Sequence, residues 1–131
     1  MKNLSKAHQA AKAARKNAYA PYSKFKVGAA LVLKNGEIVS GCNVENASYG
    51  ATVCAERNAF FTAVGKFGKF ETQAIVLVTE PEAVPCGLCL QVMAEFCTPN
   101  CEIYLGTPKK LGKSVKLKEL LTRPFSPEAL R

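Results

Sequence analysis

The 131-residue sequence predicts an α/β layer structure in which helices pack against a mixed sheet. Helical and strand-like segments alternate along the chain, and an Asn-Gly pair between two apolar runs marks an antiparallel hairpin. A later, almost purely aliphatic run suits a strand that is buried on both faces. With 48% hydrophobic and 21% charged residues, and no repeat or low-complexity stretch, the chain is expected to form one domain over residues 1–131.

The first expected elements are a helix and a hairpin. Small apolar residues recur at helical spacing over 5–19, and Pro21 ends that helix. Strands are expected over 26–33 and 38–44. Asn35-Gly36 between them suits the two positive-φ positions of a type I′ turn, so the strands should run antiparallel.

The second half of the chain continues the alternation of helices and strands. Thr52 is the expected N-cap of a helix that runs to about residue 64, and the aliphatic run 74–79 is the expected central strand. Pro85 suits a position at or near the first turn of a helix that reaches residue 96. The remaining predicted elements are a short strand over 102–105 and a strand or short helix between residues 114 and 121.

The composition favours a soluble, cytoplasmic protein. The Lys- and Ala-rich N-terminus lacks the apolar centre of a secretory signal, and apolar stretches such as 27–33 are too short to span a bilayer. The six cysteines are therefore not interpreted as a disulfide framework. Cys42, Cys97 and Cys101 are expected to be buried or half-buried thiols, with a Cys97–Cys101 bridge as the alternative.

The formal charge of +8 raises nucleic-acid binding as a hypothesis, because basic surfaces attract phosphate. The lysines are scattered over the first helix, the first strand and the C-terminal tail, without the aromatic residues of a base-stacking surface. A solvated basic surface is therefore favoured over a nucleic-acid platform.

Two short cysteine clusters predict a zinc site. Cys54 is followed two residues later by Glu56, and Cys86 and Cys89 form a Cys-x-x-Cys pair. Three thiolates leave the fourth position of a zinc ion for water, whereas a structural zinc uses four protein ligands. Each cluster stands at a predicted helix start, where the helix dipole favours thiolate over thiol. Cys54, Cys86 and Cys89 are therefore the predicted ligands of a catalytic zinc.

Glu56 is the predicted general acid and base beside this metal. It would take a proton from zinc-bound water, and the resulting hydroxide would add to an electrophilic carbon such as C4 of cytosine before ammonia leaves. Arg57 lies three residues after Cys54, on the same helix face, and is expected to donate hydrogen bonds to the sulfurs and offset their charge. The only histidine, His8, is expected to be a surface residue rather than a ligand.

Several sequence segments support a more specific interpretation. In order along the chain they read YAPYSKF with VGAAL, GCNVENASYG, TVCAER and PCGLC. Together they resemble the small, homotetrameric cytidine deaminase family over nearly the whole chain. The resemblance implies a three-layer α/β/α fold, with a mixed sheet of about five strands and helices on both faces. It also implies a Zn²⁺-dependent hydrolase that converts cytidine and deoxycytidine to uridine and deoxyuridine in pyrimidine salvage.

The resemblance also assigns roles in substrate binding. Phe25 would stack on the pyrimidine ring, and Asn43 and Glu45 would hydrogen-bond the ribose 3′-hydroxyl. Ala55 would contact the substrate beside the metal. Phe125 would close the pocket of a neighbouring subunit in a homotetramer that shares its active sites.

Two departures from the family pattern leave alternatives open. Leu90 stands where the family commonly has an arginine, and Leu88 stands where a smaller residue is usual. With Leu90 in place, Arg57 alone would neutralise the thiolates. The alternatives are a deaminase of a modified cytosine nucleoside or another aminated heterocycle, a polynucleotide deaminase, and a non-catalytic zinc module.

Overall fold

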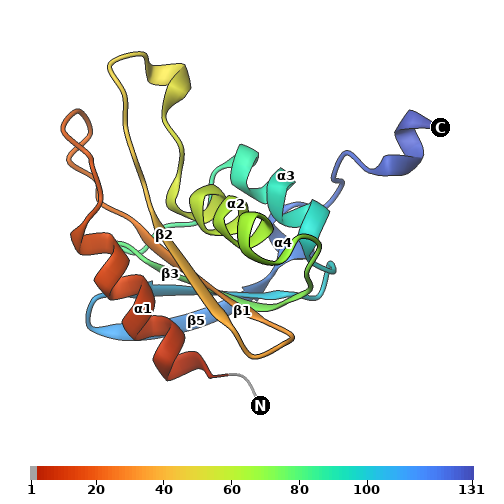
Figure 1. The fold of residues 1–131 in the computed structure, drawn as a ribbon, viewed down its shortest axis with the longest axis horizontal. Coiled ribbons are helices and arrows are strands. Elements are labelled where there is room, and N and C mark those ends of the chain that lie inside the picture. Colours follow the sequence, from red (N-terminus) through yellow and green to blue (C-terminus); the bar gives the residue numbers. More distant parts are fainter. Residues whose placement is uncertain (1–2) are drawn as a thin grey trace.

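The structure, a computed structural model, describes residues 3–131 and contains a five-stranded mixed sheet with helices on both faces (Figure 1). The elements are α1 (Leu4–Lys16), β1 (Gly28–Leu33), β2 (Ile38–Cys42), η1 (Tyr49–Ala51), α2 (Ala55–Phe67), β3 (Thr72–Val78), α3 (Gly87–Phe96), β4 (Glu102–Thr107), β5 (Lys110–Lys116), α4 (Leu117–Leu120) and η2 (Pro127–Leu130). The strand order is β2-β1-β3-β4-β5, in which β3 and β4 are parallel and the other neighbours are antiparallel. This arrangement confirms the predicted mixed sheet.

Different helices cover the two faces of the sheet. On one face, Ala7 and Ala11 of α1 belong to a buried cluster that includes Val76 and Val78 of β3. On the other face, Leu77 of β3 belongs to a larger cluster with side chains of α2, α3 and α4. Because β3 is covered on both sides, it has the continuous aliphatic sequence expected of a central strand.

Two glycines allow helices to lie close to the sheet. A Cβ atom at Gly28 on β1 would collide with the backbone oxygen of Ala11 in α1. A Cβ atom at Gly41 on β2 would lie 2.7 Å from the nitrogen of Ala59 and 2.9 Å from the oxygen of Ala55, both in α2. Backbone atoms cannot swing aside as side chains do, so only glycine fits these two positions without moving the helix.

The hairpin pairs antiparallel as expected, but its turn is different from the predicted one. Gly36 has a φ of +91°, whereas Asn35 is not among the residues with positive φ, so the turn is not of type I′. The N–H of Gly36 donates to the carbonyl of Leu33 (3.0 Å), and the N–H of Leu33 donates to the carbonyl of Glu37 (2.9 Å). The glycine thus supplies the single left-handed position of a three-residue loop.

The first two helices have boundaries that differ from the sequence prediction. α1 ends before Tyr19, which forms a bridge with Val44. Val44 also pairs with Val53, and this extended pairing delays the start of α2. Cys54, rather than Thr52, is therefore the N-cap residue of α2.

The later elements lie close to their predicted positions. Pro85 lies directly before Cys86, the N-cap residue of α3, which agrees with its predicted place at or near the first turn. The segment predicted as a strand or a short helix contains both, since β5 begins at Lys110 and α4 follows it directly. None of the helices in residues 3–131 is both long enough and apolar enough to cross a membrane.

His8 was expected on the surface, and this expectation is wrong. Its side chain is 9% exposed, and its Nε2 atom lies 2.8 Å from the carbonyl oxygen of Thr107 at the end of β4. His8 directly follows Ala7 on the face of α1 that packs on the sheet, so its ring is carried into this interface. It does not belong to the group of potential metal ligands identified among the described residues.

The cysteines outside the predicted metal site are thiols, as expected. Cys42 and Cys97 are half-buried and Cys101 is buried, and none of the six cysteines, all within residues 3–131, forms a disulfide. The thiol of Cys97 hydrogen-bonds with that of Cys101, which raises the pKa of Cys97. The alternative of a bridge between these two residues is therefore not supported.

Candidate metal centre and active site

The sulfur atoms of Cys54, Cys86 and Cys89 form one cluster. The Sγ atoms of Cys54 and Cys86 are 3.7 Å apart, those of Cys86 and Cys89 are 3.5 Å apart, and all three lie within 4.8 Å of one another. A tetrahedral zinc ion with Zn–S bonds of about 2.3 Å sets its sulfur ligands roughly 3.8 Å apart. The three cysteines therefore fit the donor set and the spacing of a zinc site.

Two helix starts bring these sulfurs together. Cys54 is the N-cap residue of α2, Cys86 is the N-cap residue of α3, and Cys89 lies in the first turn of α3. The free N–H groups at a helix N-terminus carry partial positive charge, which favours thiolates there. The three cysteines differ in solvent exposure: Cys86 is exposed, Cys54 is half-buried and Cys89 is buried.

Arg57 contributes the positive charge that the sequence predicted beside the thiolates. Its Nη2 atom lies 3.6 Å from the Sγ of Cys54 and 3.5 Å from the carbonyl oxygen of Thr52. Hydrogen bonds from Cys89, Arg57 and Cys86 lower the pKa of Cys54 to about 5. The pKa of Cys89 is raised because its thiol donates to Cys54. Cys54 thus ionises before Cys89.

Glu56 lies next to the cluster but is not part of it. It occupies the first turn of α2 and is only 5% exposed. Burial raises the pKa of Glu56 to about 7, and the negative charge of Cys54 acts in the same direction. A carboxyl group with a pKa near neutrality is suited to both accept and donate a proton. This environment is the one expected of a general acid and base.

A cavity of about 270 Å³ joins Glu56 and the cysteines to the residues predicted to bind substrate. This volume lies near the lower end of the range for small-molecule sites. Six of the predicted site residues line the cavity, namely Phe25, Asn43, Glu45, Cys54, Glu56 and Cys86. The structure thus brings together residues from the segment before β1, the end of β2, the start of α2 and the start of α3.

Asn43 and Glu45 shape the wall of this cavity. Asn43 accepts a hydrogen bond from the N–H of Val27 through Oδ1 (2.9 Å) and donates one to the carbonyl of Phe25 through Nδ2 (2.8 Å). Glu45 accepts hydrogen bonds from the N–H groups of Tyr22 (3.0 Å) and Ser23 (3.1 Å). These four contacts hold the loop that carries Phe25.

Ser23 links the two halves of this arrangement. Its hydroxyl donates to the Oε2 atom of Glu45 and accepts a hydrogen bond from the N–H of Phe25 (3.0 Å). The first of these contacts is the main reason that the pKa of Glu45 is lowered. Lys24, between Ser23 and Phe25, has a φ of +63°, an unusual value for a residue with a side chain. The loop therefore keeps a conformation that its hydrogen bonds enforce.

Four predicted site residues do not line the cavity. Cys89 is buried and contacts Cys86, Arg57 contacts Cys54, and Ala55 is fully buried at the start of α2. Phe125 is 61% exposed and lies in the C-terminal tail, which extends away from the body of the molecule (Figure 1). Its backbone is held by Gln91, whose side chain accepts from the N–H of Phe125 (3.2 Å) and donates to its carbonyl (2.8 Å).

The two leucines that depart from the family pattern lie outside the cavity. Leu90 is 8% exposed and belongs to the main hydrophobic cluster, whereas Leu88 is 65% exposed. Neither side chain forms part of the cavity wall in one chain, so they do not reshape it directly. Arg57 is the only positively charged residue in contact with the sulfurs among residues 3–131.

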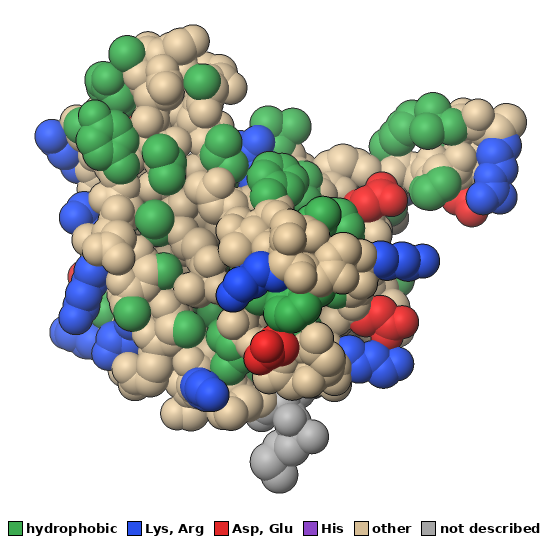
Figure 2. Space-filling model, viewed as in Figure 1, with side chains coloured by type: hydrophobic (Ala, Val, Ile, Leu, Met, Phe, Trp, Pro, Cys, Tyr) green, Lys and Arg blue, Asp and Glu red, His purple; other side chains and the backbone are tan. Residues whose placement is uncertain are grey.

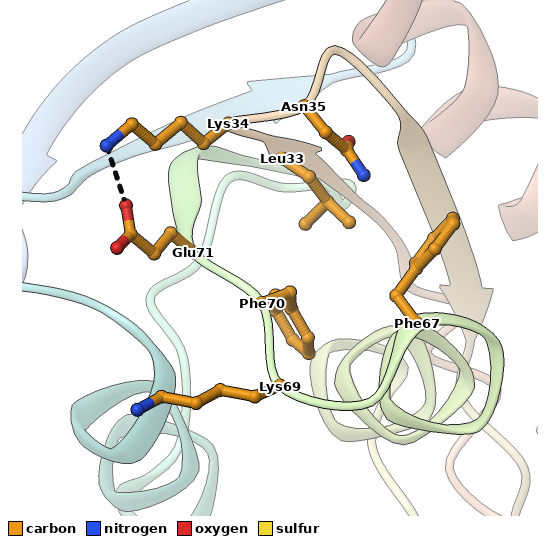
Figure 3. Close-up of a pocket in the computed structure, with 7 residues that line it drawn as sticks. All are labelled: Leu33, Lys34, Asn35, Phe67, Lys69, Phe70 and Glu71. Atoms are coloured by element: carbon orange, nitrogen blue, oxygen red, sulfur yellow. Dashed lines mark ion pairs between the residues drawn. The ribbon is translucent and has the colours of Figure 1, made fainter.

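A larger and more open hollow of about 630 Å³ lies elsewhere, between the end of β1 and the C-terminal end of α2 (Figure 3). Phe67, Phe70 and Leu33 supply apolar walls, and Lys34 and Glu71 form an exposed ion pair at its rim (3.0 Å). Exposed pairs of this kind contribute little energy because water and salt screen them. The hollow contains none of the predicted site residues, so the smaller cavity is the candidate site.

Comparison with known proteins assigns the chain to a family. Residues 1–105 match the family model described as the cytidine and deoxycytidylate deaminase zinc-binding region. The chain belongs to this deaminase family. A cytidine deaminase from Sporosarcina psychrophila is 48% identical over 120 residues, which are 91% of this chain and 88% of that protein. A cytidine deaminase from Halalkalibacterium halodurans is 46% identical over 117 residues, 88% of each chain.

A solved structure agrees with this assignment to the deaminase family. The crystal structure of cytidine deaminase from Burkholderia pseudomallei matches with a TM-score of 0.84 at 45% identity, and the match covers 95% of this chain and 100% of that chain. The family resemblance, the α/β fold and zinc as the cofactor are therefore confirmed.

The sequence analysis missed several residues of the site, among them Ser23, Thr79 and Gln91. Ser23 and Thr79 line the cavity, and Gln91 holds the backbone of Phe125. Ser23 lies inside the YAPYSKF segment, so its position next to Phe25 was a usable signal. Thr79 ends an aliphatic strand and Gln91 lies within a helix, and neither position has a local pattern that distinguishes it from an ordinary polar residue.

Proposed function

We propose that this protein is a zinc-dependent hydrolase that deaminates cytidine and deoxycytidine to uridine and deoxyuridine. The observation that carries the proposal is the single cavity in which a buried glutamate with a pKa of about 7 meets two of three clustered thiols. Its relatives at 46–48% identity are named cytidine deaminases, which supports the same substrate. Pyrimidine salvage is the corresponding cellular role, with residues 1–131 acting as one catalytic domain.

The hydrogen bonds at one end of the cavity favour a sugar hydroxyl as ligand. After its two contacts with the loop, the amide of Asn43 keeps one N–H for another acceptor. The Oε2 atom of Glu45 accepts from Ser23 and keeps capacity for another donor. One donor and one acceptor match a single hydroxyl, such as the 3′-hydroxyl that ribose and deoxyribose share. Phe25, which is 36% exposed, supplies an aromatic face for the base.

Glu56 carries out the proton transfers at the other end. When bound, zinc supplies a Lewis acid that makes a water molecule acidic enough to attack the ring at neutral pH. Glu56 would accept each of the two protons that this water loses and pass one to the ring nitrogen and one to the amino group, so that the water oxygen becomes the C4 carbonyl oxygen and the amino group leaves as ammonia. Cys54, Cys86 and Cys89 hold the metal, and Arg57 offsets part of their negative charge.

The charges around the cavity favour a nucleoside over a nucleotide or a polynucleotide. Among the described residues that line it, none is Lys, Arg or His, so one chain offers no cation for a phosphate. On the face shown in Figure 2, basic side chains occur on the left side, near the middle and on the right side of the molecule. This distribution supports the solvated basic surface inferred from the sequence.

We also propose that four copies of the chain assemble and share their active sites. Large apolar side chains are exposed at the margin of the cavity and in the tail, namely Tyr22, Tyr49, Phe125 and Leu130. Exposed apolar surface of this kind marks protein contacts. Phe125 does not line the cavity of its own chain, so its proposed partner is the cavity of a neighbour. Sedimentation at micromolar concentration should give four times the 14.1 kDa chain mass, and a monomer would contradict the proposal.

We propose that the protein is cytoplasmic, because all six of its cysteines are free thiols, which an oxidising compartment would oxidise.

Substitution of Glu56 tests the catalytic proposal. Glu56→Gln keeps the shape of the side chain but removes its proton chemistry, so cytidine turnover should fall about 10²–10⁴-fold while each chain keeps one zinc. Glu37→Gln, at an exposed position of the hairpin, is the matched control and should leave turnover unchanged. Uridine formation is measured by chromatography and zinc by elemental analysis. An active Glu56→Gln protein would contradict the assigned role.

A substrate panel tests the identity of the nucleoside. Ammonia release is compared for cytidine, deoxycytidine, deoxycytidine monophosphate, modified cytosine nucleosides and a cytosine oligonucleotide. Cytidine and deoxycytidine should be turned over at similar rates, because the predicted sugar contact involves one hydroxyl only. Fast turnover of another compound beside negligible turnover of cytidine would replace the proposed substrate.

A further inference from the structure

Thr79 has a buried hydroxyl without a hydrogen-bond partner. The residue is 2% exposed, and its Oγ1 atom has no partner among residues 3–131. Its backbone N–H, in contrast, donates to the carbonyl of Gly106 (3.1 Å). Buried hydroxyl groups in folded proteins are nearly always hydrogen-bonded, so an unpaired one at a fixed position requires an explanation.

The position of Thr79 directs its side chain into the candidate cavity. Side chains of β3 alternate between the faces of the sheet, and Leu77 faces α2 and α3 whereas Val78 faces α1. Thr79 follows Val78 and therefore shares the face of Leu77. Both Leu77 and Thr79 line the cavity that contains Glu56.

Pairing of β1 with β3 places Thr79 beside the loop that carries Phe25. Gly28 of β1 pairs with Val78 of β3, so Val27 lies opposite Thr79 where the two strands continue. Val27 also lines the cavity, and its N–H is held by Asn43. Arg57 Nε is another buried polar atom without a partner among the described residues, and the hydroxyl of Thr72 interacts with the thiol of Cys97; neither residue lines the cavity.

The other polar side chains of the cavity are largely committed. Asn43, Glu45 and Ser23 bind one another or the loop, and the hydroxyl of Thr52 accepts from the N–H of Asn46 (3.3 Å). Because the remaining capacity of Asn43 and Glu45 is assigned to the sugar hydroxyl, Glu56 and Thr79 are the two buried side chains proposed for the polar atoms of a ring. A cytosine ring presents an amino group, a ring nitrogen and a carbonyl oxygen. One carboxyl group cannot hydrogen-bond all three.

We propose that the hydroxyl of Thr79 hydrogen-bonds the polar edge of the pyrimidine ring and contributes to recognition of the base. This proposal rests on the proposed function. A hydroxyl donates one hydrogen bond and accepts others, so it suits either the amino group or the carbonyl oxygen of the ring. The substrate then supplies the partner that the protein does not, and part of the binding energy comes from pairing a group that is already desolvated.

Two variants at this position separate the hydroxyl from the rest of the side chain. Thr79→Val keeps the shape and removes the hydroxyl, whereas Thr79→Ser keeps the hydroxyl and removes a methyl group. Thr72→Val is the control, because it removes another buried hydroxyl at the opposite end of β3, outside the cavity. Each zinc-loaded protein is assayed for kcat and KM with cytidine, for inhibition by uridine, and for the melting temperature without ligand.

Thr79→Val should lower kcat/KM for cytidine roughly tenfold, the effect of losing one hydrogen bond. It should also raise the melting temperature of the unliganded protein by about 2–5 °C, because an unpaired buried hydroxyl is replaced by a methyl group. Thr79→Ser should keep kcat/KM within about threefold of the unmodified protein, and Thr72→Val should not change kcat/KM.

Several results would overturn the proposal. An unchanged kcat/KM in Thr79→Val would show that the hydroxyl does not reach the substrate. A loss in Thr79→Ser with none in Thr79→Val would assign the effect to packing of the methyl group. A lower melting temperature in Thr79→Val would assign the hydroxyl a structural role. Absence of cytidine turnover by the unmodified, zinc-loaded protein would instead refute the proposed function, which distinguishes the two failures.

Discussion

Replacing Gly41 by alanine should displace the helix that carries Cys54 and Glu56. The added Cβ atom would lie 2.7 Å from the nitrogen of Ala59, whereas ordinary van der Waals contact begins at 3.4 Å, so α2 has to recede by about 0.7 Å. Forced repacking of this kind costs about 1–3 kcal/mol of folding free energy. A shift of this size at the start of α2 also changes the distance between Glu56 and the reacting atoms, and kcat should fall about tenfold or more.

Gly65→Ala is the matched control for this experiment. Gly65 lies in the same helix, and a Cβ atom there meets nothing within 4 Å, so alanine should stabilise the protein by about 0.5–1 kcal/mol through its better helix propensity. Urea unfolding of both zinc-loaded variants gives the free energies, and cytidine turnover gives kcat. If Gly41→Ala matches the unmodified protein in stability and turnover, the close approach of β2 and α2 does not position the site.

Two further predictions concern charge at the metal centre. In the metal-free protein, the pKa of Glu56 is raised from 4.5 to about 7, so its contribution to stability is fully present below pH 4.5 and is lost as the pH rises through 7, by about 3 kcal/mol. Urea unfolding from pH 5 to pH 8 should therefore show Glu56→Gln gaining stability relative to the unmodified protein, and a difference independent of pH would contradict the raised pKa. Arg57→Gln should weaken zinc binding about 10–100-fold, measured by competition with a chromophoric chelator, because the thiolate of Cys54 loses its donor. Arg123→Gln, at an exposed position of the tail, should bind zinc normally, and equal affinities for all three proteins would exclude a role of Arg57 at the metal.

The local sequence pattern was sufficient to predict the hairpin and the central strand of the sheet. The aliphatic run that forms β3 and the Asn-Gly hairpin signal both gave strands in the structure. The same local reasoning placed the start of α2 at Thr52, where a threonine usually caps a helix. It failed there because Val53 pairs with Val44, a contact between segments that propensity does not include.

The metal site was also predictable from local spacing, whereas the substrate contacts required the resemblance. The Cys-x-x-Cys pair supplies two thiolate ligands, and the Cys-x-Glu pair supplies a third thiolate and a proton donor. Three metal ligands and a general acid could therefore be identified from the sequence. His8 was misjudged because residues near it in the sequence are charged, whereas its burial depends on the packing of α1 on the sheet, where its ring contacts the carbonyl of Thr107 at the end of β4. Thr79 was not identified, because an unpaired hydroxyl is a property of the folded surroundings and not of the residue type.

The two helix starts of the metal centre belong to separate stretches of the chain, since Cys54 and Cys86 are 32 positions apart. A zinc ion bound to both helix starts links these two stretches in the native state, whereas the unfolded chain binds zinc only weakly. Folding is thereby coupled to the free zinc concentration. Each tenfold rise of that concentration above the dissociation constant increases the free energy of unfolding by about 1.4 kcal/mol. The amount of native enzyme in a cell therefore depends on the zinc supply as well as on synthesis of the chain.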